Sequence, residues 1–136
     1  MEVEIFALCD AATISGGKLN ILGAFHVIRA TSAPFTHRPV AVAFRARFDK
    51  TEVGPKVFEI RFLDSAGNPI NEPIAAKSTV PAPTRSDFTV VQIAIEARKL
   101  ILPKFGEYRV DLAIDGLVVK SLPLFAREQA PPSVSS

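Results

Sequence analysis

Apolar and charged residues alternate over the second half of the stretch 40–48, where Arg45 and Arg47 lie between Phe44 and Phe48. Successive side chains of a strand point to opposite faces, so this pattern predicts a strand with one buried face. The charged positions mark the face turned to solvent. The aromatic positions mark the face turned to a core.

The same alternation recurs in two further stretches, 56–63 and 107–114, which are therefore also predicted as strands. Their charged side chains are expected to point outward and their apolar side chains inward. The outward set is Glu59, Arg61, Glu107, Arg109 and Asp111, and the inward set is Phe58, Ile60, Phe62, Tyr108, Val110, Leu112 and Ile114.

Asp115-Gly116 predicts a two-residue hairpin turn between 107–114 and a following strand, 117–125. Pro123 has no backbone N–H to donate, so this last strand is expected to be an edge at that point. The turn also predicts a register, which pairs Ile114 with Leu117, Leu112 with Val119 and Asp111 with Lys120.

The pattern that predicts the remaining strands is less regular. No stretch of the chain shows the 3.6-residue period of a helix. The long segment 65–87 contains four prolines and is expected to hold a short edge strand at 74–80, since long structureless loops are rare in compact domains. The tail 129–136 is rich in Pro and Ser and is expected to be disordered, which leaves 1–128 as one domain. The other predicted strands are 3–9, 18–29 and 88–97.

The stretch LPKFGEYRVDLAIDG, from Leu102 to Gly116, resembles the corner and sixth strand of fibronectin type III and other immunoglobulin-like domains. Tyr108 takes the position of the tyrosine corner, while the Trp and paired cysteines of antibody domains are missing. The fold predicted is an all-β, immunoglobulin-like antiparallel β-sandwich of seven or eight strands.

In contrast to the charged faces, the strands 3–9, 18–29 and 88–97 place apolar residues at the same parity as their polar ones. If these strands are neighbours, their outer face carries an apolar patch large enough to mark a contact surface. Alternatively, the segment 65–87 or the tail folds back over this apolar patch and covers it within the same chain. The candidate interface consists of Phe6, Leu8, Leu22, Ile28 and Val90.

Net charge is +2 with both signs interspersed, so the basic surface of a nucleic-acid-binding protein is not expected. Most outward charges are interpreted as ordinary solvated surface. Four arginines remain as weaker candidates for an anion or partner site: Arg45, Arg47, Arg61 and Arg109.

No catalytic, metal-binding or cofactor-binding motif is found, so an enzyme is not predicted. Cys9, the single cysteine, is interpreted as a small buried apolar residue. A catalytic site would have to bring Cys9 and Asp10 together with a histidine, His26 or His37. The glycines after Ser15 lack the spacing of a phosphate-binding loop and are expected to form a hairpin turn.

No apolar run approaches the length of about 20 residues that a membrane helix needs. The start of the chain carries two glutamates and no basic residue before its apolar run, unlike a secretory signal. A cytoplasmic location and no membrane contact are therefore expected.

Over nearly the whole chain, the segments LCDAA, GKLNILGAF and GEYRVDLAIDG are similar to a family of small bacterial proteins of unknown function. An aspartate often follows GAF in that family, where this chain has His26. The resemblance implies a single β-sandwich domain and supplies no activity.

The function expected from these patterns is a non-enzymatic module for protein binding or self-assembly, acting through the apolar outer face around Leu22. The alternative is a domain that binds a small molecule or carbohydrate with the end loops 31–39 and 65–87.

Overall fold

The computed structural model describes residues 1–130, which form eleven strands and one short 3₁₀-helix, η1 (Lys50–Glu52). Short strands joined by glycine- and proline-containing turns are what the sequence pattern predicts. The strands are β1 (Glu2–Ser15), β2 (Lys18–Ala24), β3 (Val27–Ala30), β4 (Phe35–His37), β5 (Val40–Asp49), β6 (Gly54–Asp64), β7 (Ile74–Val80), β8 (Phe88–Ala97), β9 (Leu100–Leu102), β10 (Gly106–Ile114) and β11 (Leu117–Glu128).

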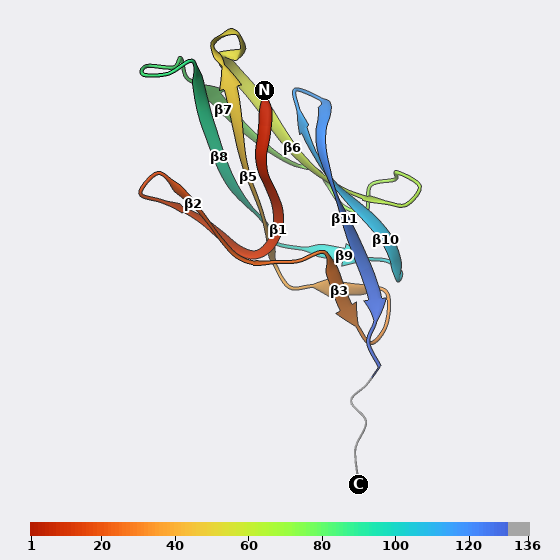
Figure 1. The fold of residues 1–136 in the computed structure, drawn as a ribbon. Coiled ribbons are helices and arrows are strands. Elements are labelled where there is room, and N and C mark those ends of the chain that lie inside the picture. The colour runs from red at the N-terminus through yellow and green to blue at the C-terminus, as the bar shows by residue number, and fades with distance from the viewer. Residues whose placement is uncertain (131–136) are drawn as a thin grey trace.

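Two main sheets pack face to face as a sandwich (Figure 1). One has the strand order β2-β1-β5-β8, and the other has the order β3-β11-β10-β6-β7. The short strands β4 and β9 form a separate pair at one end. The all-β sandwich is confirmed, and the predicted seven or eight strands are too few because one predicted strand divides and two short strands were not foreseen.

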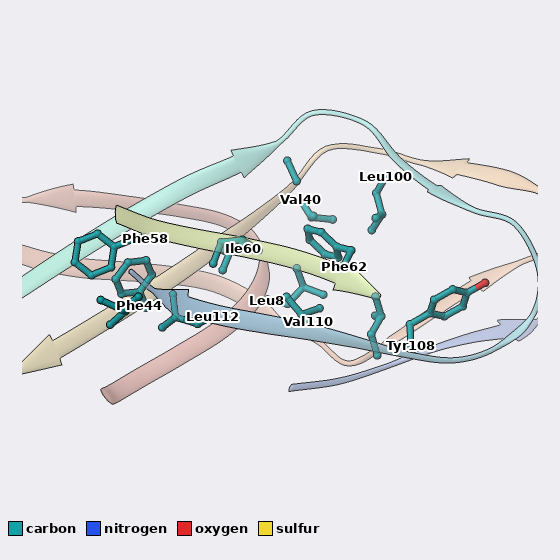
Figure 2. Close-up of a cluster of buried hydrophobic side chains, with 14 of the residues drawn as sticks. Leu8, Val40, Phe44, Phe58, Ile60, Phe62, Leu100, Tyr108, Val110 and Leu112 are labelled. Atoms are coloured by element: carbon teal, nitrogen blue, oxygen red, sulfur yellow. The ribbon is translucent and has the colours of Figure 1, made fainter. Parts of the chain in front are cut away.

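Aromatic residues from both sheets meet at the centre of the core. Phe44 of β5 lies against Phe58 of β6 with ring centroids 5.2 Å apart, and Phe48 approaches Phe58 edge-on at 6.3 Å. Figure 2 shows Phe44 and Phe58 together, with Ile60 and Leu112 beside them. The predicted inward faces of 40–48 and 56–63 are therefore confirmed, and dispersion and burial of these rings hold the sheets together.

Tyr108 forms the predicted tyrosine corner at the start of β10. Its hydroxyl donates to the Lys104 carbonyl over 2.6 Å and accepts from the Lys104 backbone N–H over 3.2 Å. The ring is buried in the core, with its oxygen at the end of the cluster (Figure 2). A buried tyrosine needs such a partner for its hydroxyl, so this bond fixes the entry of β10 into the sheet.

The predicted single strand 18–29 is wrong, because the chain changes sheets at Phe25 and His26. β2 belongs to the four-stranded sheet, whereas β3 pairs in parallel with β11 from Phe125 onward. Ile28 consequently points into the core and is 3% exposed. Pro123 lies just before this pairing begins, so the predicted edge at Pro123 is confirmed.

The expected neighbours in the first sheet also need correction. β5 lies between β1 and β8, so the charged strand 40–48 shares a sheet with 3–9 and 88–97, which were expected to be neighbours on an apolar outer face. Arg45 and Arg47 on β5 therefore lie on the opposite side of the sandwich from Arg61 on β6 and Arg109 on β10.

A β-bulge changes the predicted register of the β10–β11 hairpin. Ile114 does pair with Leu117, but the register shifts next to Ala113, so Leu112 lies opposite Lys120 and Asp111 opposite Ser121. The bulge adds one residue to β11 and moves every later pair by one. Asp111 is then 2% exposed and accepts hydrogen bonds from Ser121 Oγ at 2.6 Å and Arg109 Nε at 2.8 Å.

A second bulge, in β1, overturns the predicted facing of its side chains. Val3 pairs with Ala46 and Ile5 with Arg45, so Glu4 is the extra residue. Alternation restarts after it, and Phe6 and Leu8 turn toward the core.

The segment 65–87 contributes the predicted strand 74–80 as β7, which pairs with β6 at the edge of the five-stranded sheet. It therefore does not cover the outer face of the other sheet. β11 ends at Glu128, and the expectation of a disordered tail falls largely on 131–136, outside the described residues.

Candidate interaction surface on the β1–β2 hairpin

The second half of β1 leaves the sandwich and forms a hairpin with β2. Pairing of β1 with β5 ends at Cys9, and from there Ala11 to Ser15 pair with Lys18 to Leu22. The turn at Gly16-Gly17 has φ of 57° and 72°, a left-handed conformation at both residues that matches the twist of a two-residue hairpin. The predicted hairpin turn after Ser15 is confirmed, and Figure 1 shows the hairpin extending from the body of the sandwich.

One side of the hairpin packs on small residues of the outer face of β1 and β5. Ala12 and Leu19 contact a buried cluster made of Cys9, Ala41 and Ala43. The Cys9 thiol lies 3.5 Å from the Ala41 carbonyl oxygen. Small side chains allow close approach, so the hairpin itself is the internal cover of this part of the outer face.

A row of hydrogen bonds holds the tip of the hairpin over the sheet. Arg45 of β5 donates from Nε to Glu4 and from Nη1 to the Gln92 side-chain oxygen, both over 2.9 Å. Gln92 of β8 then donates from Nε2 to the Gly17 carbonyl over 2.9 Å. Because Gln92 is fixed by Arg45, the turn is positioned by a prearranged donor.

The base of the hairpin closes around Asp10 and Gly23. Gly23 has φ of 69°, and a Cβ at this position would overlap the Asp10 carboxylate and lie 3.0 Å from Asp10 Cγ. The other carboxylate oxygen of Asp10 pairs with Arg38 Nη2 at 3.1 Å. Glycine is therefore required here both for backbone conformation and for space.

The hairpin leaves large apolar side chains in solvent. Leu22 is 70% exposed and Ile14 is 46% exposed, and Ile21 is also exposed. Ile14 and Ile21 share the side that carries Ala12 and Leu19, while Leu22 lies on the other side, opposite Ala11. β2 therefore carries apolar side chains on both of its sides, as predicted.

The five predicted interface residues do not form one patch. Leu22 is exposed, and Val90 lies opposite Arg47 on the outer face of the sheet. Phe6, Leu8 and Ile28 belong to the core or pack against it. Two features of the sequence point to Ile14 and Ile21. One is the Gly16-Gly17 turn, and the other is the hydrophobic residues that lie at equal distances before and after this turn.

The four candidate arginines are separated as well. Each forms an ion pair with a neighbouring carboxylate, on two different faces of the sandwich. These pairs are Arg45 with Glu4, Arg47 with Glu2, Arg61 with Glu59 and Arg109 with Asp111. The structure does not gather them into an anion site.

Cavities lie next to the hairpin and at the end of β8. One of about 370 Å³ lies beneath the hairpin, lined by alanines of β1, β5 and β8 and by Asp10 and Glu96. Another of about 440 Å³ is lined by Asn71, Ile74 and Ile101. The lining of this second cavity comes from 71–74 and 96–101 and includes no residue of the loop 31–39.

No group of three His, Cys, Asp or Glu side chains among residues 1–130 is placed to hold a metal ion. Asp10 and His37 line one cavity of about 300 Å³, whereas Cys9 is not part of its lining. In the same residues, no helix is long and apolar enough to cross a membrane.

Burial raises the pKa of the Cys9 thiol, and the nearby Asp10 charge raises it further. The native thiol stays protonated at pH values where the unfolded thiol, with pKa of about 8.5, ionises. Its contribution to stability is therefore complete below about pH 8.5 and is lost as pH rises toward the native pKa.

We expect urea unfolding at about pH 9.5, compared with pH 7, to show a larger loss of stability for the wild type than for Cys9→Ala. We also expect a thiol reagent at pH 7 to modify native Cys9 at least about tenfold more slowly than the unfolded chain. Equal rates would contradict the buried placement of the thiol.

These features define a β-sandwich domain with an anchored, partly apolar hairpin on the outside of one sheet. The chain belongs to a family of unknown function, DUF6941, whose family model matches residues 4–127. A comparison with curated proteins finds no match.

Comparison with solved structures shows a likeness in fold to one protein and a weaker match to a second. A β-glucosidase from Listeria innocua, in complex with isofagomine, matches with a TM-score of 0.52 and 12% identity over 94% of this chain. The alkylpurine DNA glycosylase AlkC from Pseudomonas fluorescens, bound to DNA containing an abasic site analog, matches at a TM-score of 0.41, with 13% identity over 90% of this chain. This chain spans 16% of the glucosidase chain and 30% of the glycosylase chain, so the likeness concerns one part of larger proteins.

Proposed function

We propose that this protein is a non-enzymatic binding module that engages a protein partner through the β1–β2 hairpin. The observation that carries the proposal is Leu22, a large apolar side chain that is 70% exposed on a hairpin whose turn and base are held in place. An isolated hairpin would be only marginally stable, so these anchors serve to present a defined surface.

The chemistry of the hairpin fits a protein surface as its partner. Ile14, Ile21 and Leu22 offer apolar contact on both of its sides, with polar Thr13 and Asn20 between them. Buried apolar anchors surrounded by polar groups are typical of the energetic centre of protein interfaces.

A photo-crosslinking residue at position 22 tests the proposal in cells, with the same residue at Lys50 of η1 as the control site. We expect position 22 to yield a discrete protein adduct that position 50 does not yield. Identical crosslinking at both positions would contradict a specific surface at the hairpin.

The crosslinked protein is then purified and titrated with wild type and Leu22→Asp. Burying a leucine contributes about 1.5–3 kcal/mol, so the variant is expected to bind at least about tenfold more weakly. Thr13→Asp, which adds the same charge to the same hairpin, is expected to have a smaller effect. Both variants should unfold at the wild-type temperature, because neither side chain is buried.

A further inference from the structure

The outer edge of β8 is long, regular and unpaired in residues 1–130. β8 pairs with β5 through ten consecutive residue pairs without a register shift, so its opposite edge carries an uninterrupted row of backbone donors and acceptors. It contains no proline, glycine or basic residue, and Glu96 is its single charge. Monomeric proteins normally protect such an edge against pairing with another chain.

The other exposed edges of the two sheets are protected in recognised ways. β3 has four residues, and β2 carries Lys18 and the left-handed Gly23. β7 carries Lys77 and lies between Pro73 and Pro81. The unpaired part of β11 has Lys120, Pro123 and the bulge. β8 therefore differs from every other edge strand of the two main sheets.

The side of the sandwich next to β8 is also incompletely closed. Ile93 and Ile95 point inward from β8 but remain only partly buried, whereas their partners Phe44 and Val42 on β5 are fully buried. Ile74 on β7, the edge strand of the facing sheet, is also only partly buried. A strand added to β8 would carry alternate side chains into this opening.

We propose that β8 pairs antiparallel with β8 of a second copy of this chain, about a twofold axis at Ile93. Such an isologous contact joins the two four-stranded sheets into one of eight strands. In this register Ile93 lies opposite its own copy, and Val91 lies opposite Ile95 of the other copy. These inward apolar pairs continue the core across the interface.

Charges at the two ends of the strand favour this partner. The register brings Asp87, just before β8, beside Lys99 of the other copy, and it does so twice because of the symmetry. Phe88, which is 43% exposed, lies beside Arg98 of the other copy. Neither Asp87 nor Lys99 forms an ion pair with another residue of the described chain, so both charges are available.

The cavity at the end of β8 supports the same arrangement. Asn71 Oδ1 is buried there without a hydrogen-bond partner in residues 1–130, and Glu72 lies in the same lining. The segment before β8 of the second copy passes along 96–101 in this register, which brings Arg85 toward the cavity. A guanidinium offers several donors, and an unpaired buried oxygen is costly to leave unsatisfied.

Charge exchange at Asp87 and Lys99 tests the pairing, with mass measured by sedimentation over a concentration series. We expect a reversible wild-type dimer that each of Asp87→Lys and Lys99→Asp weakens about tenfold, since each converts two attractive pairs into repulsive ones. A mixture of the two single variants, and the double variant D87K/K99D, should regain the wild-type dimer. Lys77→Asp on the edge of β7 is the control and should leave the dimer unchanged.

Both substituted positions are exposed, and unchanged melting temperatures verify folding. A wild type that stays monomeric up to about 1 mM, a concentration at which even weak pairs associate, would overturn the proposal. So would a dimer that resists both charge changes but dissociates on Leu22→Asp, since that dimer uses the hairpin surface. Failure of the hairpin proposal, in contrast, leaves the charge-exchange result unaffected.

Discussion

Replacing Phe58 with alanine is expected to lower the free energy of unfolding by about 3–5 kcal/mol, the usual cost of removing a buried aromatic ring. Phe58 is fully buried and contacts Phe44 and Phe48 of the opposite sheet. Its loss leaves a cavity between the two layers that neither rigid sheet can close. Urea unfolding followed by circular dichroism measures the change.

Phe88→Ala is the matched control, because Phe88 is exposed and lies outside the core cluster. Its expected cost is below about 1 kcal/mol. The pair Phe44→Ala and Phe58→Ala, measured alone and together, should show coupling of about 0.5–1.5 kcal/mol for the aromatic contact. Equal effects of Phe58→Ala and Phe88→Ala would contradict the sandwich core described above.

Gly23→Ala is expected to destabilise the protein by about 2–5 kcal/mol and to release the base of the hairpin. The left-handed backbone at Gly23 costs an alanine about 1–2 kcal/mol. The new methyl group also overlaps the Asp10 carboxylate, and such overpacking adds about 1–3 kcal/mol unless Asp10 moves and gives up Arg38. Urea unfolding gives the total, and limited proteolysis within residues 10–24 reports the loosened hairpin.

Gly17→Ala separates the two causes. Gly17 has φ of 72°, close to that of Gly23, but a Cβ there meets no atom within 4 Å. The cost of Gly17→Ala therefore comes from the backbone conformation alone, and we expect the free energy of unfolding to fall by about 1–2 kcal/mol. If Gly17→Ala and Gly23→Ala lower the free energy of unfolding equally, the close approach of Asp10 to Gly23 adds no cost of its own.

Local alternation predicted the facing of side chains wherever a strand is regular. Charged and aromatic residues along β5 and β6 gave the correct inner and outer faces, and Tyr108 gave the corner. The alternation failed at Glu4, and the predicted register failed at the bulge of β11 beside Ala113, because a bulge inserts one residue without any change in composition.

Sheet membership was less accessible from the sequence than the strands themselves. The alternation of β5 says that one face is buried but not which strands lie beside it, so its place between β1 and β8 was missed. The break after Ala24 was missed because apolar residues continue through Phe25 to Ile28, although the chain changes sheets there. Pairing of distant strands depends on the whole chain and not on a local period.

For the candidate site, the sequence predicted one exposed residue but not the contacts that surround it and hold the hairpin. Leu22 was identified because it interrupts the polar side of its strand. Ile14 and Ile21 were not identified. Ile14 lies beyond the predicted strand 3–9, and Ile21 falls on the side of 18–29 opposite its polar residues, so neither is recognised as exposed until the hairpin is seen to leave the sandwich. The bonds from Arg45 through Gln92 to Gly17 join three distant parts of the chain and leave no local signal.

The parallel pair of β3 and β11 has a consequence for the order in which the protein folds during synthesis. Val27 pairs with Phe125, so a segment made early waits for a strand that is made about 100 residues later. The β1–β2 hairpin closes over a two-residue turn, and its anchors Arg38 and Gln92 are made well before β11. The crossing from β2 to β3 becomes fixed only when β11 arrives, because pairing across such a sequence distance is slow. We therefore expect the nascent chain to carry a formed hairpin on an open first sheet, and the last strand to fasten the beginning of the chain to its end.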